Sequence, residues 1–316
     1  EDGSRYGTQK VLVKITTGTY KGKEKQAINP SGTLFGADYK VGARIIVIVN
    51  KSGTNAGFTV YSQDRTMAIY GFALIFAAVV CAIGGKKGVY AILSLVFAFA
   101  CIIGIMFPMM YRGISPIVLT IIVAVLTTIV TLGLLGGYSS KTVSAILGTA
   151  IGVVIAAVAA MTFGKAAGIT GYNVSDIEAL NYVGQNTKIK IGELLFAGII
   201  ISALGAVMDV GMSIASTIQE IYETDKTLSM KRLFVSGINV GRDMMGTMTN
   251  TLIFAYVGGA MTTLVINYAY DLSYRQLANS YVIGIEIMQG LSGSLGVVLT
   301  VPITALIASF LAVRKK

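Results

Sequence analysis

From residue 66 onward the chain consists of long apolar runs separated by short polar loops. The runs cover Met67–Ile83, Val89–Met109, Ile117–Leu135, Val143–Phe163, Leu194–Ile214, Met244–Ile266 and Ile283–Val313. As helices rising 1.5 Å per residue, they can each cross about 30 Å of hydrocarbon. The pattern therefore predicts about seven transmembrane helices in residues 66–316. The last run is too long for one straight crossing, and Pro302 predicts a break or re-entrant start within it.

Residues 1–65 have a different pattern. Apolar and polar positions alternate in Val11–Thr17 and Ala43–Val49, which is typical of β-strands, and glycines at 18, 22, 36, 42 and 53 mark turns. We expect a small, barrel-like all-β domain of five or six strands over 1–65. Because the chain begins with Glu1 rather than Met, we also expect an upstream signal or anchor segment that was removed or left out.

Composition agrees with a membrane class. Hydrophobic residues make up 54% of the chain and charged residues 13%, with a mean hydropathy of +0.73, whereas soluble domains carry about 25% charged residues. There is no histidine, which excludes His-based zinc sites and Ser-His or Cys-His nucleophiles. Cys81 and Cys101 lie in apolar runs and indicate neither a disulfide framework nor a metal site. We therefore expect no enzyme, no cofactor and no resident metal.

The net charge of +10 is spread over loops and the N-terminal region, which argues against nucleic-acid binding. Alternate loops differ in basic residues: one side has ten, at 86, 87, 141, 226, 231, 232, 242 and 314–316, and the other has five, at 112, 165, 188, 190 and 275. Cytoplasmic loops are the more basic ones. The prediction is a cytoplasmic C-terminus, with the β-domain and the 164–192 loop outside.

The 164–192 loop carries its own helix signal. Ser175 and Glu178 have the spacing of a capping box, in which the hydroxyl and the carboxylate satisfy free backbone N–H groups at a helix start. This predicts a short surface helix there.

Asp209 is the clearest ionisable residue inside an apolar run. A charge at mid-membrane costs about 2.5–3.5 kcal/mol, so it usually marks a pathway or a paired site. Ser202, Gly205, Asp209 and Ser213 recur at steps of three or four residues and share one small, polar helix face. Such a face suits close helix contact. We expect the acid to point into the bundle.

The following span offers a partner for this acid. Its candidate polar face holds Asn239, Arg242, Gly246, Thr249 and Asn250, with Asp243 beside it. An arginine near Asp209 favours the charged carboxylate and burial favours the neutral one, so a balanced acid could exchange protons. A static buried ion pair that fixes packing explains the same spacing.

Packing is predicted from the small residues of the two faces. Ser202, Gly205, Ser213, Gly246 and Thr249 should bring the two helices side by side. The polar stretch 219–233 between them predicts a helical hairpin projecting into the cytoplasm.

Glu286 is a third candidate, close to Gly290 at the external end of the last run. It belongs to the relay, or it is an interfacial residue on a helix that has not yet entered the hydrocarbon.

Two blocks of sequence carry a family resemblance. Gly205–Ser216 and Gly237–Thr251 together resemble the bacterial YibE/F membrane protein family, and so do Tyr20–Lys23, Gly84–Gly88 and Pro108–Pro116. The resemblance covers nearly the whole chain. It implies a multi-pass protein of the bacterial cytoplasmic membrane and assigns no biochemical activity by itself.

Residues 209–242 are also similar, more weakly, to the SecF half of the SecD/SecF accessory proteins of the resistance-nodulation-division superfamily. That similarity implies Asp209 as proton acceptor and Arg242 as its partner, with Gly237-Ile-Asn239 matching a Ser-x-Asn motif. Met208 stands where that family has Asn, and the large periplasmic domains have no counterpart, so protein translocation is not implied.

Two hypotheses of function follow. In the first, the protein is transporter-like and couples an unknown substrate to a proton or other ion through Asp209 and Arg242. In the second, it is a non-transporting accessory or regulatory protein whose β-domain binds an envelope partner. The partners these hypotheses imply are the lipid bilayer, the ion and its substrate, a second copy, or an envelope protein.

Overall fold

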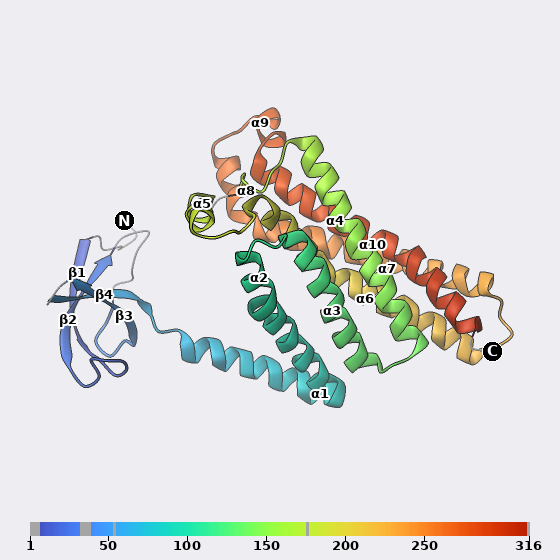
Figure 1. Cartoon of the computed structure of the whole chain (residues 1–316), viewed down its shortest axis with the longest axis horizontal. Coiled ribbons are helices and arrows are strands. Elements are labelled where there is room, and N and C mark those ends of the chain that lie inside the picture. The colour runs from blue at the N-terminus through green and yellow to red at the C-terminus, as the bar shows by residue number, and fades with distance from the viewer. Residues whose placement is uncertain (1–6, 32–38, 53–54, 175–176, 315–316) are drawn as a thin grey trace. The chain divides into compact units, whose positions relative to one another are not determined.

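The computed structural model of the protein describes residues 7–31, 39–52, 55–174 and 177–314. Residues 36, 53, 175, 315 and 316, which carry two predicted turns, the capping serine and the last basic charges, lie outside these ranges. The chain forms two compact units, Glu1–Ala82 and Ile83–Lys316. Most of it is helical (Figure 1).

The N-terminal unit carries a small sheet. Its strands are β1 (Gly7–Lys14), β2 (Glu24–Ser31), β3 (Ile45–Ser52) and β4 (Asn55–Gln63), in the order β1-β2-β4-β3. The β1–β2 and β3–β4 pairs are antiparallel, and β2 pairs with β4 in parallel. The described residues thus form a four-stranded sheet rather than the five or six strands predicted. Its apolar side buries Val13, Ala27, Phe58 and Val60.

A long apolar helical segment follows the sheet. It comprises α1 (Thr66–Cys101), the π-helical η1 (Ile102–Met106) and α2 (Phe107–Tyr111). Gly85, at φ 54° and ψ −131°, interrupts the helical conformation between the first two predicted spans. The parts before and after Gly85 measure roughly 28 Å and 39 Å at 1.5 Å per residue, so each is long enough to cross a bilayer.

Four further helices coincide with single predicted spans: α3 (Pro116–Gly136), α4 (Ser140–Ala167), α6 (Leu194–Thr224) and α10 (Tyr281–Arg314). Ser115 and Ser139 cap the starts of α3 and α4 by accepting backbone N–H bonds. Pro302 lies inside α10 without ending it, so the predicted break is wrong.

The remaining predicted span is bent. The helices α7 (Met230–Gly259) and α8 (Met261–Ala269) meet at 60° around Ala260. Among the described residues, five helices are long and apolar enough to cross a membrane, or six if the bent pair is one span. This count is below seven because the segment 66–111 counts once.

Three short helices complete the chain: α5 (Ile177–Asn186), η2 (Ile191–Glu193) and α9 (Tyr274–Ala278). The first confirms the surface helix predicted in the 164–192 loop.

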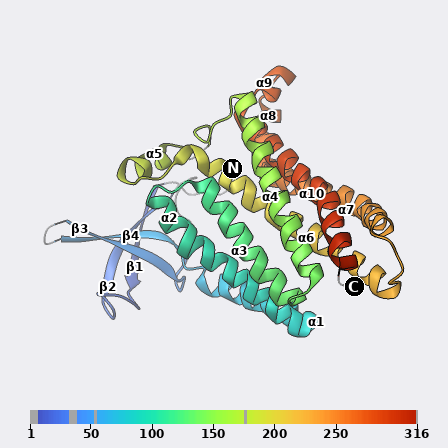
Figure 2. The ribbon, with the colours of Figure 1, turned by 45° about the vertical axis from the view of Figure 1, so that its right-hand side comes forward.

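The centre of the helical unit is built on glycine contacts. Helix α10 packs against α4, α6 and α7 (Figures 1 and 2). A Cβ at Gly152 of α4 would lie 1.9 Å from Thr300 Oγ1 of α10, and one at Gly241 of α7 would lie 2.2 Å from Val301 Cγ1. Only glycine fits at such contacts. Small residues thus let these helices approach closely, as membrane helices commonly do.

The predicted hairpin between α6 and α7 is present. In its turn, Asp225 Oδ1 accepts hydrogen bonds from the Thr227 backbone N–H at 2.9 Å and the Thr227 hydroxyl at 2.6 Å. Tyr222 and Leu233 are buried in the same apolar cluster as Ala308 and Ala312 of α10. The hairpin therefore packs against the end of α10.

Candidate functional site

Asp209 is the middle residue of α6, which extends from Leu194 to Thr224. Its side chain is exposed, as are Ser202 and Gly205 on the same face, whereas Val207 and Val210 are fully buried. Asp209 therefore lies on an open face of the helix rather than in the packed core. The expectation that the acid points into the bundle is not met, because the apolar face of α6 is the one that contacts α4 and α10.

Contacts between α6 and α7 define how the two helices are aligned. The Tyr256 hydroxyl donates to Ser202 Oγ at 2.9 Å, and a Cβ at Gly237 would lie 2.6 Å from Ile218 Cδ1. This antiparallel alignment places Asp209 level with 246–249 and Arg242 level with 213–216. The two ionisable residues therefore differ in depth by roughly 6–10 Å at 1.5 Å per residue.

No ion pair or hydrogen bond joins Asp209 to Arg242 within the described ranges, and both side chains are exposed. The described residues therefore contain no static buried ion pair between Asp209 and Arg242. The other polar candidates on α7 are also accessible at Asn239, Asp243 and Asn250. Each of these side chains therefore lies on a surface that the described residues do not cover.

Thr249 differs from these residues. Its hydroxyl oxygen is buried and has no hydrogen-bond partner in the described part of the chain. By the alignment above it lies at the level of Asp209. A buried polar atom without a partner among the described residues thus lies at about the same depth as the carboxylate.

The predicted packing residues behave differently from one another. A Cβ at Gly205 or Gly246 would meet no described atom within 4 Å, so the predicted close contact through these two glycines is not made between the described helices. Ser202 does contact α7, through Tyr256. Ser213 is half-buried, and its carbonyl accepts a bond from the Thr217 hydroxyl within α6.

Gly237 and Gly241 make the tight contacts of α7 instead, against Ile218, Ala305 and Val301. Sequence reasoning missed them as packing residues. Their spacing of four residues is the small-xxx-small signal that could have identified them.

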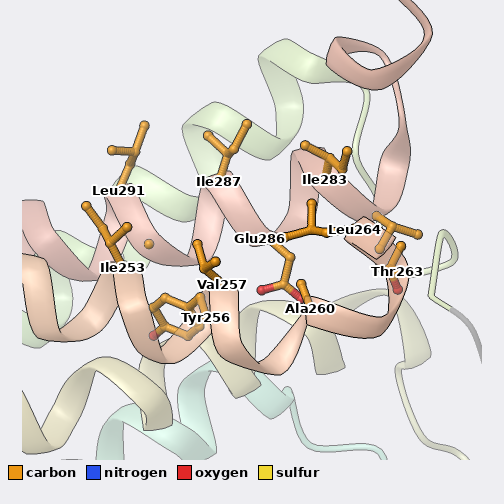
Figure 3. A pocket seen from close by; sticks show the side chains of 12 residues that line it. Ile253, Tyr256, Val257, Ala260, Thr263, Leu264, Ile283, Glu286, Ile287 and Leu291 are labelled. Carbon is orange, nitrogen blue, oxygen red and sulfur yellow. The ribbon is translucent and has the colours of Figure 1, made fainter. Parts of the chain in front are cut away.

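Glu286 lies apart from Asp209. Helices α6 and α10 run in parallel, because Gly293 lies against Ala203 and Gly296 against Val207. This alignment places Glu286 near the start of α6, about twelve residues or roughly 18 Å from the level of Asp209. Glu286 instead lines a cavity of about 220 Å³ between α7, α8 and α10 (Figure 3). The structure thus separates the predicted relay residues into two places.

The chemistry available at the open face is that of one carboxylate in the middle of an apolar helix. Within the described ranges, no three His, Cys, Asp or Glu residues lie close enough together to hold a metal ion. A single carboxylate can bind and release a proton or a monovalent cation.

Comparisons with known proteins agree with the resemblance found in the sequence. A family model described as YibE/F-like protein matches residues 72–314. Neither the curated proteins nor the solved structures include a significant match. The similarity to SecD/SecF stays a prediction.

Proposed function

We propose that this chain, which belongs to the YibE/F-like family, is a transporter-like protein coupled to a proton or another ion at Asp209. Several of its described helices are long and apolar enough to cross a membrane. One observation carries the proposal: the carboxylate lies halfway along a 31-residue apolar helix, exposed and without a cationic partner in the described chain.

A charged carboxylate at this depth is stable only if something compensates its charge. A proton, a bound cation, a water-filled path or a residue of another chain can do so. A proton is the simplest, since it removes the charge and can leave again. Asp209 then alternates between a protonated state and a charged state.

Arg242 supplies the compensation for the charged state. It lies one to two turns from the level of Asp209, and an arginine side chain can extend about half of that distance along its stem. We propose that the two side chains pair after the proton leaves. Asn239, Asp243, Thr249 and Asn250 provide polar groups on the same helix as Arg242.

Orientation follows the charge bias of the loops. With ten basic residues on one side and five on the other, the proposal places the C-terminus in the bacterial cytoplasm and the β-unit outside. The open face of α6 has exposed glycines. Because small residues allow another helix to approach closely, a second copy of the chain could pack against this face.

The test is ion flux in proteoliposomes containing the full chain. Asp209→Asn keeps the volume of the side chain and removes its charge, so flux should fall to background. Asp225→Asn is the matched control, because it changes the same residue type in the turn of the same hairpin. Arg242→Lys should reduce flux, since an ammonium lacks the planar fork that pairs with a carboxylate. Flux that is unchanged in Asp209→Asn would overturn the proposal.

A second function has one supporting observation. The β-unit exposes a row of apolar side chains opposite its buried face, and Leu12, Ile28, Ile48 and Tyr61 belong to it. Ile28 and Ile48 both pair with Thr59 in the sheet. Exposed apolar patches mark interaction sites, so an accessory protein that binds an envelope partner is the alternative. Normal growth in Asp209→Asn together with a growth defect in Leu12→Ser/Ile48→Ser would favour it.

A further inference from the structure

The cavity beside Glu286 is made by the bend between α7 and α8. Because the chain bends by 60° at Ala260, α8 leaves the direction of α7, and its residues line the same space as the first turns of α10. Thr263 and Leu264 of α8 then line one end of the cavity, and Ile253 and Leu291 line the other (Figure 3). The cavity thus lies between the end of α7, α8 and the first turns of α10.

The walls of the cavity are almost entirely apolar. Aliphatic side chains of α7 and α10 form most of the lining, including Val257, Ile283 and Ile287. Gly290 leaves room in the middle, because a Cβ there would lie 3.6 Å from Tyr256 Cδ2 and 3.8 Å from Ile253 Cγ1. A space of about 220 Å³ with such walls suits an apolar body of about ten non-hydrogen atoms.

Among the described residues that line this space, two have ionisable side chains, Tyr256 and Glu286. The Tyr256 hydroxyl already donates to Ser202 on α6. The Glu286 carboxylate extends from α10 towards Val257 and Ala260 at the end of α7 (Figure 3). Neither a hydrogen bond nor an ion pair within the described residues satisfies it. A carboxylate left without a partner among apolar walls favours a cation that brings its own apolar surface.

We propose that this cavity binds a lipophilic organic cation, with the charge at Glu286 and the apolar body between α7, α8 and α10. The aromatic ring of Tyr256 adds a second group that attracts cations. A membrane-soluble amine or quaternary ammonium of arylalkyl size has both features. The inference does not depend on the role of Asp209, since the two carboxylates are about 18 Å apart in depth.

Binding is tested with benzyltrimethylammonium, whose permanent charge does not titrate, and with neopentylbenzene, its neutral isostere. The full chain in detergent is dialysed to equilibrium against the isotope-labelled cation. We expect saturable binding, at least tenfold weaker in Glu286→Gln and unchanged in the control Asp225→Asn, which removes a carboxylate from the hairpin turn between α6 and α7. Neopentylbenzene should compete at least tenfold more weakly than unlabelled cation.

A second variant keeps the binding test informative if Glu286→Gln does not fold. Gly290→Ala adds one methyl group at ordinary contact distances, so it should fold and yet weaken binding by reducing the cavity. Gly205→Ala, which adds a methyl group to an open face, is its control. Equal binding of the cation to wild type, Glu286→Gln and Gly290→Ala would overturn the proposal. So would equal competition by neopentylbenzene, which would identify the cavity as a site for lipid hydrocarbon.

Discussion

Gly152→Ala should destabilise the helical unit, because α4 and α10 meet at this glycine. The added Cβ would lie 1.9 Å from Thr300 Oγ1 and 2.8 Å from Val207 Cγ1. Both neighbours are β-branched and stiff, and the Thr300 hydroxyl donates to the Gly296 carbonyl at 2.7 Å. Overpacking a tight core typically costs about 1–3 kcal/mol. We therefore expect the free energy of unfolding to fall by about 2 kcal/mol.

The measurement is SDS-induced unfolding in mixed micelles, followed by circular dichroism. Gly205→Ala is the control, because its Cβ would meet no described atom within 4 Å; alanine favours a helix interior over glycine, so this variant should be as stable as wild type or more stable by up to about 1 kcal/mol. Removing the neighbour should relieve the strain, so Gly152→Ala should cost less in a Thr300→Ala background than in wild type. Equal stability of Gly152→Ala and Gly205→Ala, or the same cost in both backgrounds, would refute the contact.

Two further predictions concern α7 and the hairpin turn. Gly246→Ala should leave the free energy of unfolding unchanged or raise it by up to about 1 kcal/mol, because no described atom lies within 4 Å of the added Cβ; a loss above about 2 kcal/mol in the same SDS titration would contradict this. In the turn, hydrogen bonds from the Thr227 hydroxyl and backbone N–H lower the pKa of Asp225. A lowered carboxyl pKa stabilises the turn fully above about pH 4 and loses effect as pH falls through the lowered value. Thr227→Val should therefore move acid-induced pepsin cleavage of the turn to higher pH, and an identical pH profile would refute it.

The sequence alone determined the class of the molecule and most of its elements. Runs of about twenty apolar residues are typical of membrane-spanning helices, because a helix satisfies its backbone groups inside a bilayer. The predicted runs accordingly coincide with α3, α4, α6 and α10. Local signals also succeeded, since a polar stretch after an apolar run predicted the α6–α7 hairpin. The family assignment followed from two blocks of the same region.

Tertiary structure decided which face of each helix is buried. A nearly uniform apolar helix has little contrast between the side that meets lipid and the side that meets protein, because lipid tails are as apolar as leucine. Glycines at 205 and 246 therefore resembled those at 152 and 241, yet only the latter pair touch a neighbouring helix. Such contacts depend on which residue another helix presents.

The candidate site shows the same division. Asp209 and Glu286 are both acids within apolar runs, and their spacing along the chain contains no information about their distance in space. The parallel alignment of α6 and α10 separates them, and the pocket at the bend near Ala260 is lined by Glu286 and not by Asp209. Sequence identified the groups whose burial is costly, because that cost is a property of one side chain. What compensates each charge depends on neighbours from distant parts of the chain, and only the folded arrangement brings these together.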